Sequence, residues 1–368
     1  MATKVVLIGR KSKENYYFCT KYVNSLSLKP IELSDISRYR KPLMGLAIVF
    51  VMLFHIDIDK SNLMYSIAKC GNVGVDIFLF LSGIGLWYSW NKNPSLKHFY
   101  HRRFWRIFPE FFIMACLYYI PDYMSISPED TGNWLELLGN VTINWCFWTK
   151  GSGTFWFIPA IMAMYIFAPG YMNLIKKNSL YRWLPVIIIL LDFLVQCSFD
   201  IRHSIGHIEI FLNRIPIFLI GLNCGQSVKD NAIKIPANTI WLALLAFVIP
   251  IIINSWAIYH PSDKFPMTVI RLSYIPLSLG LITLLIHLFY ISPKWLMTTI
   301  SFLGGISLEM YLIHQHFVLY YVEEYNLGFC LSALISIPIA VALAWALHRF
   351  CHLKIWTKGL FLTHRTKE

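Results

Sequence analysis

Charged residues are scarce in this sequence. Only 14% of its 368 residues are charged, whereas 57% are hydrophobic and 16% are aromatic. A soluble domain of this length carries about 25% charged residues. The apolar excess runs along the whole chain, so it excludes a merely larger soluble core and indicates lipid as the solvent. The two ends, residues 1–42 and 351–368, are too short to fold as soluble domains.

Patterned cysteines and a cleavable leader are also missing. The chain has eight Cys, and their spacing resembles neither a metal site nor a disulfide framework. We therefore expect small buried apolar side chains and no metal, with Cys70 and Cys146 as the pair able to meet on an oxidising face. Residues 1–42 are polar and basic, and the first long apolar run begins near Leu43. We expect that run to be retained as the first membrane span.

Acidic residues are scarcer than basic ones, 20 against 32, which gives a net charge of +12. A basic balance can indicate a nucleic-acid partner. Here, however, Lys and Arg stand in short segments between apolar runs, a pattern typical of a membrane topology signal. The charge distribution therefore argues against nucleic acid and for a lipid bilayer as the partner.

Long apolar runs dominate the rest of the chain. A helix needs about 20 apolar residues to cross a bilayer, and ten segments approach this length. We predict an all-α, polytopic transmembrane helix bundle occupying residues 43–350. The predicted spans lie near 43–59, 72–90, 104–121, 154–172, 183–199, 207–225, 238–257, 268–290, 299–321 and 328–350.

The basic residues predict the orientation of this bundle. If residues 1–42 are cytoplasmic and the sides alternate, most of the 32 Lys and Arg fall on the cytoplasmic side. Acidic clusters such as Glu323 with Glu324 fall outside. We therefore predict that both termini are cytoplasmic, with a basic N-terminal segment at 1–42 and a basic tail at 351–368.

Polar residues inside spans are costly and often functional. His55 lies about 12 residues, or roughly 18 Å, into the first span and therefore towards the outer side. A histidine is the usual general base near neutral pH, although a helix-packing histidine is an equally good interpretation. Asp76, also on the outer side, could stabilise a protonated His55. A helix N-terminal anion is the alternative for Asp76.

Two arginines stand at the cytoplasmic end of the third span. Arg103 and Arg106 are three residues apart and share one helix face. Paired guanidiniums suit a polyanion such as the phosphates of coenzyme A. Ordinary positive-inside anchoring is the alternative, but Arg106 lies deeper than an anchor needs to be.

Later spans carry further polar side chains. Arg214 lies inside the sixth span, and the ninth holds Glu309, Tyr311 and His314. For each one taken singly, a buried ion pair or hydrogen bond is the better interpretation. Together they suggest a site in which a phosphate-bearing donor enters from the cytosol and an acceptor hydroxyl meets a base nearer the outer side.

Several short segments between residues 40 and 350 follow one another in a characteristic order. They are 45–47 with 54–55, 74–76 with 81–83, 103–109, 155–157 with Tyr165 and Pro169, 214–218 with Gly221, and 307–314. In this order they resemble the acyltransferase 3 family of bacterial integral membrane O-acyltransferases. No single segment is specific, and the resemblance rests on the ordered set.

The resemblance implies an enzyme of the bacterial cytoplasmic membrane that transfers acetyl from acetyl-CoA, its co-substrate, to hydroxyls of cell-surface carbohydrates or glycolipids. It implies no permanently bound cofactor. His55 would be the essential histidine, and Arg103 and Arg106 the paired cytoplasmic arginines. One position departs from the family pattern, because Met44 stands where an arginine is usual. Arg40, one helical turn earlier, is the candidate replacement.

Two mechanisms and two rival functions stay open. His55 could act as a base for direct transfer or form a covalent acyl-histidine. A transporter or exporter of acyl groups or acylated glycans could use the same scaffold, although no convincing internal repeat is present. A purely structural membrane protein is the other rival, but it would not need buried His55, Arg106, Arg214 and His314.

Overall fold

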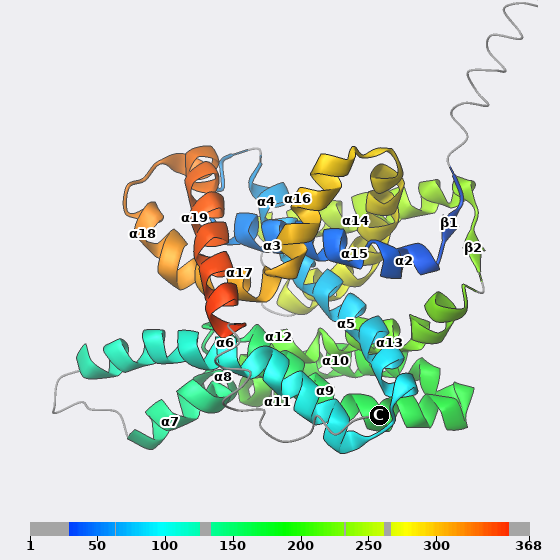
Figure 1. The fold of residues 1–368 in the computed structure, drawn as a ribbon, viewed down its shortest axis with the longest axis horizontal. Coiled ribbons are helices and arrows are strands. Elements are labelled where there is room, and N and C mark those ends of the chain that lie inside the picture. Colours follow the sequence, from blue (N-terminus) through cyan, green and yellow to red (C-terminus); the bar gives the residue numbers. More distant parts are fainter. Residues whose placement is uncertain (1–28, 63, 126–133, 232, 261–265, 353–368) are drawn as a thin grey trace, which may run out of the picture.

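The chain is almost wholly helical (Figure 1). The computed structural model describes residues 29–62, 64–125, 134–231, 233–260 and 266–352. The longer helices are α3 (Arg40–His55), α5 (Val73–Lys92), α6 (Leu96–Ser125), α7 (Trp134–Ile143), α9 (Phe157–Lys177), α10 (Leu184–Cys197), α13 (Ile215–Asp230), α14 (Ile240–Tyr259), α15 (Pro266–Ile291), α16 (Lys294–Gly305) and α19 (Gly328–Cys351).

Short elements connect these helices. They are β1 (Ile31–Glu32), α2 (Ser34–Arg38), α4 (Tyr65–Lys69), η1 (Cys70–Asn72), α8 (Trp145–Lys150), η2 (Ser179–Trp183), α11 (Phe199–Ile205), η3 (Gly206–Ile208), α12 (Glu209–Leu212), β2 (Lys234–Ile235), η4 (Ala237–Thr239), α17 (Ser307–Ile313), η5 (His314–Leu319) and α18 (Tyr320–Glu323). The prediction of an all-α bundle is confirmed, with one antiparallel pair of very short strands added to it.

Within the described residues, six stretches of helix are long and apolar enough to cross a membrane, so the protein is a multi-pass membrane protein. They are Tyr65–Lys92, Phe157–Lys177, His203–Asp230, Ala237–Tyr259, Met267–Ile291 and Gly328–Cys351. A seventh is added if α16 and the stretch Ser307–Glu323, bent by 62° at their junction, count as one broken span.

The predicted number of ten spans is not confirmed. The ten predicted segments all fall largely in helices, but three of those helices are not simple spans. With 16 and 14 residues, α3 and α10 are only about 24 and 21 Å long, short of a hydrocarbon core of about 30 Å. The 30-residue α6 is long enough but carries many charged residues in its first half. A hydropathy pattern shows where apolar segments lie, but it does not show how long each helix is.

Glycines bring the central helices into direct backbone contact. A Cβ on Gly304 of α16 would lie 1.9 Å from the Lys41 carbonyl oxygen of α3. A Cβ on Gly83 of α5 would lie 2.5 Å from the Phe218 oxygen of α13, and one on Gly221 would lie 2.3 Å from the Phe80 oxygen. Small residues at helix interfaces are the usual way for membrane helices to pack closely. This packing fixes α3, α5, α13 and α16 as one unit.

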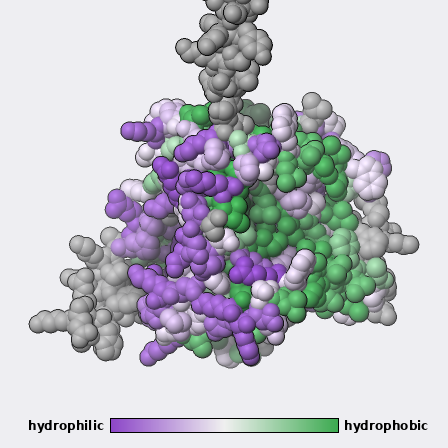
Figure 2. Space-filling model, turned by 90° about the vertical axis from the view of Figure 1, so that its right-hand side faces the viewer, coloured by the Kyte–Doolittle hydropathy of each residue, from purple (hydrophilic) through white to green (hydrophobic). Residues whose placement is uncertain are grey.

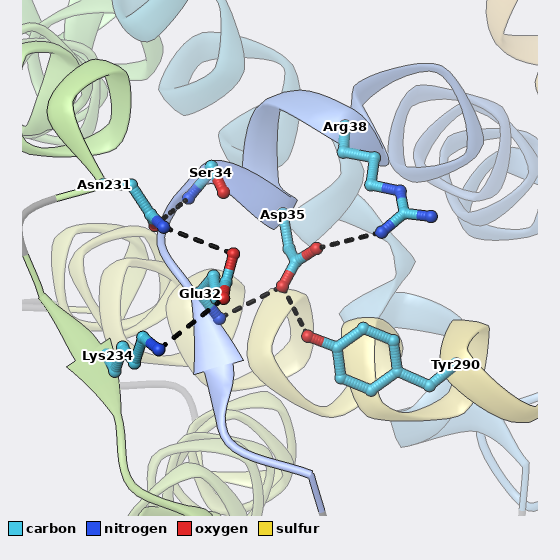
Figure 3. Close-up of polar contacts among 7 residues, drawn as sticks. All are labelled: Glu32, Ser34, Asp35, Arg38, Asn231, Lys234 and Tyr290. Atoms are coloured by element: carbon cyan, nitrogen blue, oxygen red, sulfur yellow. Dashed lines mark hydrogen bonds and ion pairs between the residues drawn. The ribbon is translucent and has the colours of Figure 1, made fainter.

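The segment before α3 is tied to two other helices (Figure 3). Strand β1 pairs with β2, and the Ser34 amide donates to the Asn231 side chain at 3.2 Å. The Asp35 carboxylate accepts hydrogen bonds from the Glu32 amide at 3.0 Å and from the Tyr290 hydroxyl of α15. These contacts hold the start of α3, and with it Arg40, in a defined place.

The surface divides by polarity. Figure 2 shows hydrophilic side chains gathered on one side of the molecule and a broad hydrophobic area beside them. Exposed large apolar residues are numerous on α10 and α14, as a lipid-facing surface requires. Among the described cysteines, Cys70 and Cys146 are free thiols. The expectation of eight buried cysteines holds for Cys70 and is wrong for Cys197 and Cys330, which are exposed. The other four described cysteines are partly buried, and Cys19 lies outside the described residues.

Candidate active site

One cavity joins the predicted arginines to the region of the predicted histidines. Its empty space, counted out to its open mouth, is about 730 Å³. The lining residues are Arg40, Met44, Val51, Val75, Phe78, Ser82, Arg103, Arg106, Ile107, Phe157, Ile161, Tyr165, Ser307, Leu308 and Tyr311. They come from α3, α5, α6, α9 and α17, so segments distant in the sequence build a single space.

Three guanidinium groups make one part of this cavity basic. Arg103 and Arg106 come from one face of α6, as predicted, and Arg40 comes from the first turn of α3. The Nε atoms of Arg40 and Arg103 are buried and find no hydrogen-bond partner among the described residues, and no carboxylate stands among the described residues of the lining. Guanidinium donors with unused hydrogen-bonding capacity can bind a phosphate-bearing anion.

Arg40 occupies the space beside Met44, the position where the family pattern has an arginine. Both side chains line the cavity. The Arg40 guanidinium lies so close to α5 that a Cβ on Gly85 would approach its Nη1 to 2.4 Å. The absence of a side chain at Gly85 therefore gives Arg40 the room to point into the bundle. This geometry fits the expectation that Arg40 substitutes for the usual arginine.

The two predicted histidines meet at the other part of the site. His314 Nε2 lies 3.2 Å from His55 Nδ1, and the rings are 4.9 Å apart. His314 Nδ1 lies 2.8 Å from the Tyr311 carbonyl oxygen, so it carries a hydrogen and its Nε2 accepts. His55 Nδ1 must then be the donor, shared between His314 and the Val51 carbonyl oxygen at 2.8 Å.

This tautomer leaves His55 Nε2 with a free lone pair. No hydrogen bond to that atom forms within the described ranges. The cavity wall reaches Val51, one helical turn before His55, and Tyr311, whose ring centre lies 6.0 Å from that of His314. A neutral imidazole held in one orientation by a second imidazole is a suitable general base.

Asp76 does not contact His55, contrary to the predicted role as its partner. Asp76 Oδ2 instead lies 3.7 Å from Arg214 Nε, and both side chains are fully buried. The Arg214 guanidinium also covers the Trp156 ring at 5.2 Å. The helix geometry explains the difference, because Asp76 faces α13 rather than α3. Arg214 is therefore placed in a buried ion pair, the interpretation preferred for it from the sequence.

A second, partly buried ion pair joins α12 to α15. Glu209 Oε2 lies 3.3 Å from Arg271 Nη1, and Glu209 Oε1 accepts hydrogen bonds from Thr268 at 2.8 Å and Asn213 at 3.1 Å. Buried charges are tolerated in an apolar bundle only when they are paired in this way. These contacts connect α12 to α15.

One histidine near the site was missed by sequence reasoning. The His316 ring lies 4.6 Å from that of Tyr118 and 5.5 Å from that of Phe155, and its buried Nε2 has no hydrogen-bond partner in the part of the chain that the structure describes. Residues two apart do not share a face of an α-helix, so its spacing from His314 gave no signal. The backbone is a π-helix from His314 to Leu319. Such bulges often occur at functional sites.

Comparison with known sequences decides the family. The Acyl_transf_3 family model, described as an acyltransferase domain, matches residues 43–349. The chain belongs to the acyltransferase 3 family. The match includes the whole cavity except Arg40, which lies three residues before its start.

Two curated relatives align with parts of this acyltransferase 3 chain. One is the regulator of hypoxia-inducible factor 1 from Caenorhabditis elegans, 32% identical over 127 residues. That alignment covers 30% of this chain and 25% of the relative. The other is the peptidoglycan O-acetyltransferase OatA from Listeria monocytogenes, 40% identical over 78 residues, which are 20% of this chain and 11% of the relative. No solved structure matches.

Proposed function

We propose that this protein is a membrane-embedded O-acyltransferase that moves an acyl group, acetyl in the first instance, from acyl-CoA to a hydroxyl of a cell-surface carbohydrate or glycolipid. The observation that carries the proposal is the single cavity, which has three guanidiniums in one part and reaches the neighbourhood of the His55–His314 pair in another. Membership of the acyltransferase 3 family and the partial similarity to a peptidoglycan O-acetyltransferase support it.

In the proposed mechanism, acetyl-CoA enters from the cytosol with its phosphates on Arg40, Arg103 and Arg106. His55 Nε2 removes the proton of the acceptor hydroxyl as its oxygen attacks the thioester carbonyl. The C–O bond forms, the C–S bond breaks, and the imidazolium returns the proton to the leaving thiolate. His314 Nε2 accepts a hydrogen bond from the charged ring. Asp76, paired with Arg214, holds the bundle rather than the base.

The proposed setting is the bacterial cytoplasmic membrane, with both chain ends in the cytosol. The basic part of the cavity then faces the compartment that contains acyl-CoA, and the histidine pair lies towards the acceptor. The basic segments between apolar helices support this orientation.

A transporter of acyl groups or acylated glycans is the second candidate, because broken spans are typical of transporter sites and α16 and α17 form one. It differs from the enzyme in one measurable way. Transport does not require a proton acceptor at His55 Nε2, whereas direct O-acyl transfer does.

The test follows acetyl transfer from acetyl-CoA in membranes, read by mass spectrometry of surface glycans for added acetyl groups. His55→Ala should lower turnover by about 100-fold or more, the usual contribution of a general base. His260→Ala is the matched control, since that histidine contacts only its own helix in the described structure. Arg103→Ala should weaken acetyl-CoA binding about tenfold, whereas Arg102→Ala, outside the cavity lining, should not. Normal turnover with His55→Ala would refute the assignment.

A further inference from the structure

A second cluster of polar side chains lies where α6, α17 and α19 meet, outside the proposed active site. Figure 1 shows the end of α19 approaching α6 and α17. Glu309 of α17 and His348 and His352 of α19 bring one carboxylate oxygen and two ring nitrogens within 4.8 Å of one another. His348 and His352 are four residues apart and share one helix face.

The contacts within the cluster are close. His348 Nδ1 lies 2.5 Å from Glu309 Oε1, and the rings of His348 and His352 are 4.3 Å apart. Two imidazoles and a carboxylate are a ligand set that Zn²⁺ prefers, with metal–ligand bonds of about 2.0–2.2 Å. Small side-chain rotations would bring the three atoms to that spacing around one ion.

A buried carboxylate beside the cluster adds an independent reason for a cation. Glu110 of α6 is 2% exposed, and its buried Oε2 meets no hydrogen-bond donor from the described ranges. Helix α6, which carries Glu110, contacts both α17 and α19, the two helices that carry the cluster. Arg106 attracts Glu110, but its guanidinium also lines the cavity. A buried carboxylate oxygen without a donor is costly in an apolar bundle, and a nearby cation would stabilise it.

We propose that Glu309, His348 and His352 bind a divalent transition-metal ion of the Zn²⁺ type, with Glu110 as a neighbouring carboxylate. The ion would join α19 to the first turn of α17 at a point where Ser307 and Leu308 form the cavity wall. It acts as a structural staple for the broken span. The inference is independent of acyl transfer, because its evidence and its test involve only the metal.

The test uses the full-length protein, purified in detergent through a tag without histidine, stripped with EDTA and titrated with ZnCl₂. Elemental analysis should find about one Zn²⁺ per chain, and Zn²⁺ should raise the thermal midpoint reversibly. Glu309→Gln and His348→Ala should each weaken Zn²⁺ binding at least about tenfold, as loss of a ligand does. His98→Ala, which removes an exposed histidine of α6, is the matched control and should bind as wild type does.

An exposed ligand allows the metal site to be tested even if a buried substitution prevents folding. His352 is exposed, so His352→Ala removes one ligand with little effect on packing. Sub-stoichiometric Zn²⁺ in the wild type would overturn the proposal and leave the cluster as a hydrogen-bonded Glu309–His348 pair. Equal Zn²⁺ affinity in wild type and His352→Ala would overturn it as well.

Discussion

At the scale of single residues, the role of each buried ionisable side chain depends on the residues that it contacts. His55 and His314 hydrogen-bond to each other and to backbone carbonyls, which sets one tautomer and leaves a lone pair free. Asp76, by contrast, pairs with Arg214. The sequence indicated that these residues matter, because ionisable groups in apolar runs are costly. It could not indicate which residues meet, since pairing depends on helix rotation and on which helices are neighbours.

The Asp76–Arg214 pair leads to a prediction about stability. Asp76→Ala should leave Arg214 charged and unpaired in an apolar interior, at a cost of about 3–5 kcal/mol. The double variant Asp76→Leu with Arg214→Met should recover much of that loss, because replacing both partners by apolar groups is often close to neutral. Thermal midpoints of the purified proteins measure both. A double variant less stable than Asp76→Ala would contradict the structural role.

At the scale of elements, irregular helices position the site. One apolar segment bends between α16 and α17, and its helix changes to a π-helix at His314. The sequence predicted a single span over 299–321, because hydropathy does not register a bend. It did predict the shared face of Arg103 and Arg106, since that follows from helical spacing alone. Helical spacing also led to the prediction that Arg40, one turn before Met44, takes the place of the missing arginine.

Adjacent glycines at the end of α16 allow a matched test of helix contact. Gly304→Ala would place a Cβ 1.9 Å from the Lys41 carbonyl oxygen, whereas Gly305→Ala meets nothing within 4 Å among the described residues. We expect Gly304→Ala to destabilise the protein by about 1–3 kcal/mol or more, as overpacking does, because backbone rather than a flexible side chain must move. Gly305→Ala should leave the thermal midpoint close to that of wild type. Similar midpoints for the two variants would rule out the close approach of α3 and α16.

At the scale of the whole molecule, composition alone was enough to predict a helical membrane protein. The scarcity of charge and the repeated apolar runs led directly to that class. The number of spans was beyond such reasoning, because α3 and α10 are shorter than a bilayer core. The predicted orientation rests on the basic segments and stays a prediction.

Orientation can be measured with single cysteines in a background whose native cysteines are replaced by alanine. Ser95 lies between α5 and α6 and Asn326 between α18 and α19, and both are exposed. A membrane-impermeant thiol reagent applied to intact cells should label Asn326→Cys, while Ser95→Cys should react only after permeabilisation. The positive-inside distribution of Lys and Arg is the reason. The reverse labelling pattern would place the arginines of the cavity outside the cell.

The pairing of Asp76 with Arg214 also has a consequence for biogenesis. Helix α5 is synthesised long before α13, so Asp76 is made without its partner. A lone carboxylate within a membrane span costs up to about 2.5–3.5 kcal/mol during insertion, the value that holds at the centre of the bilayer. We therefore expect α5 to stay beside the translocon until α13 emerges, so that the two helices enter lipid together rather than one after the other.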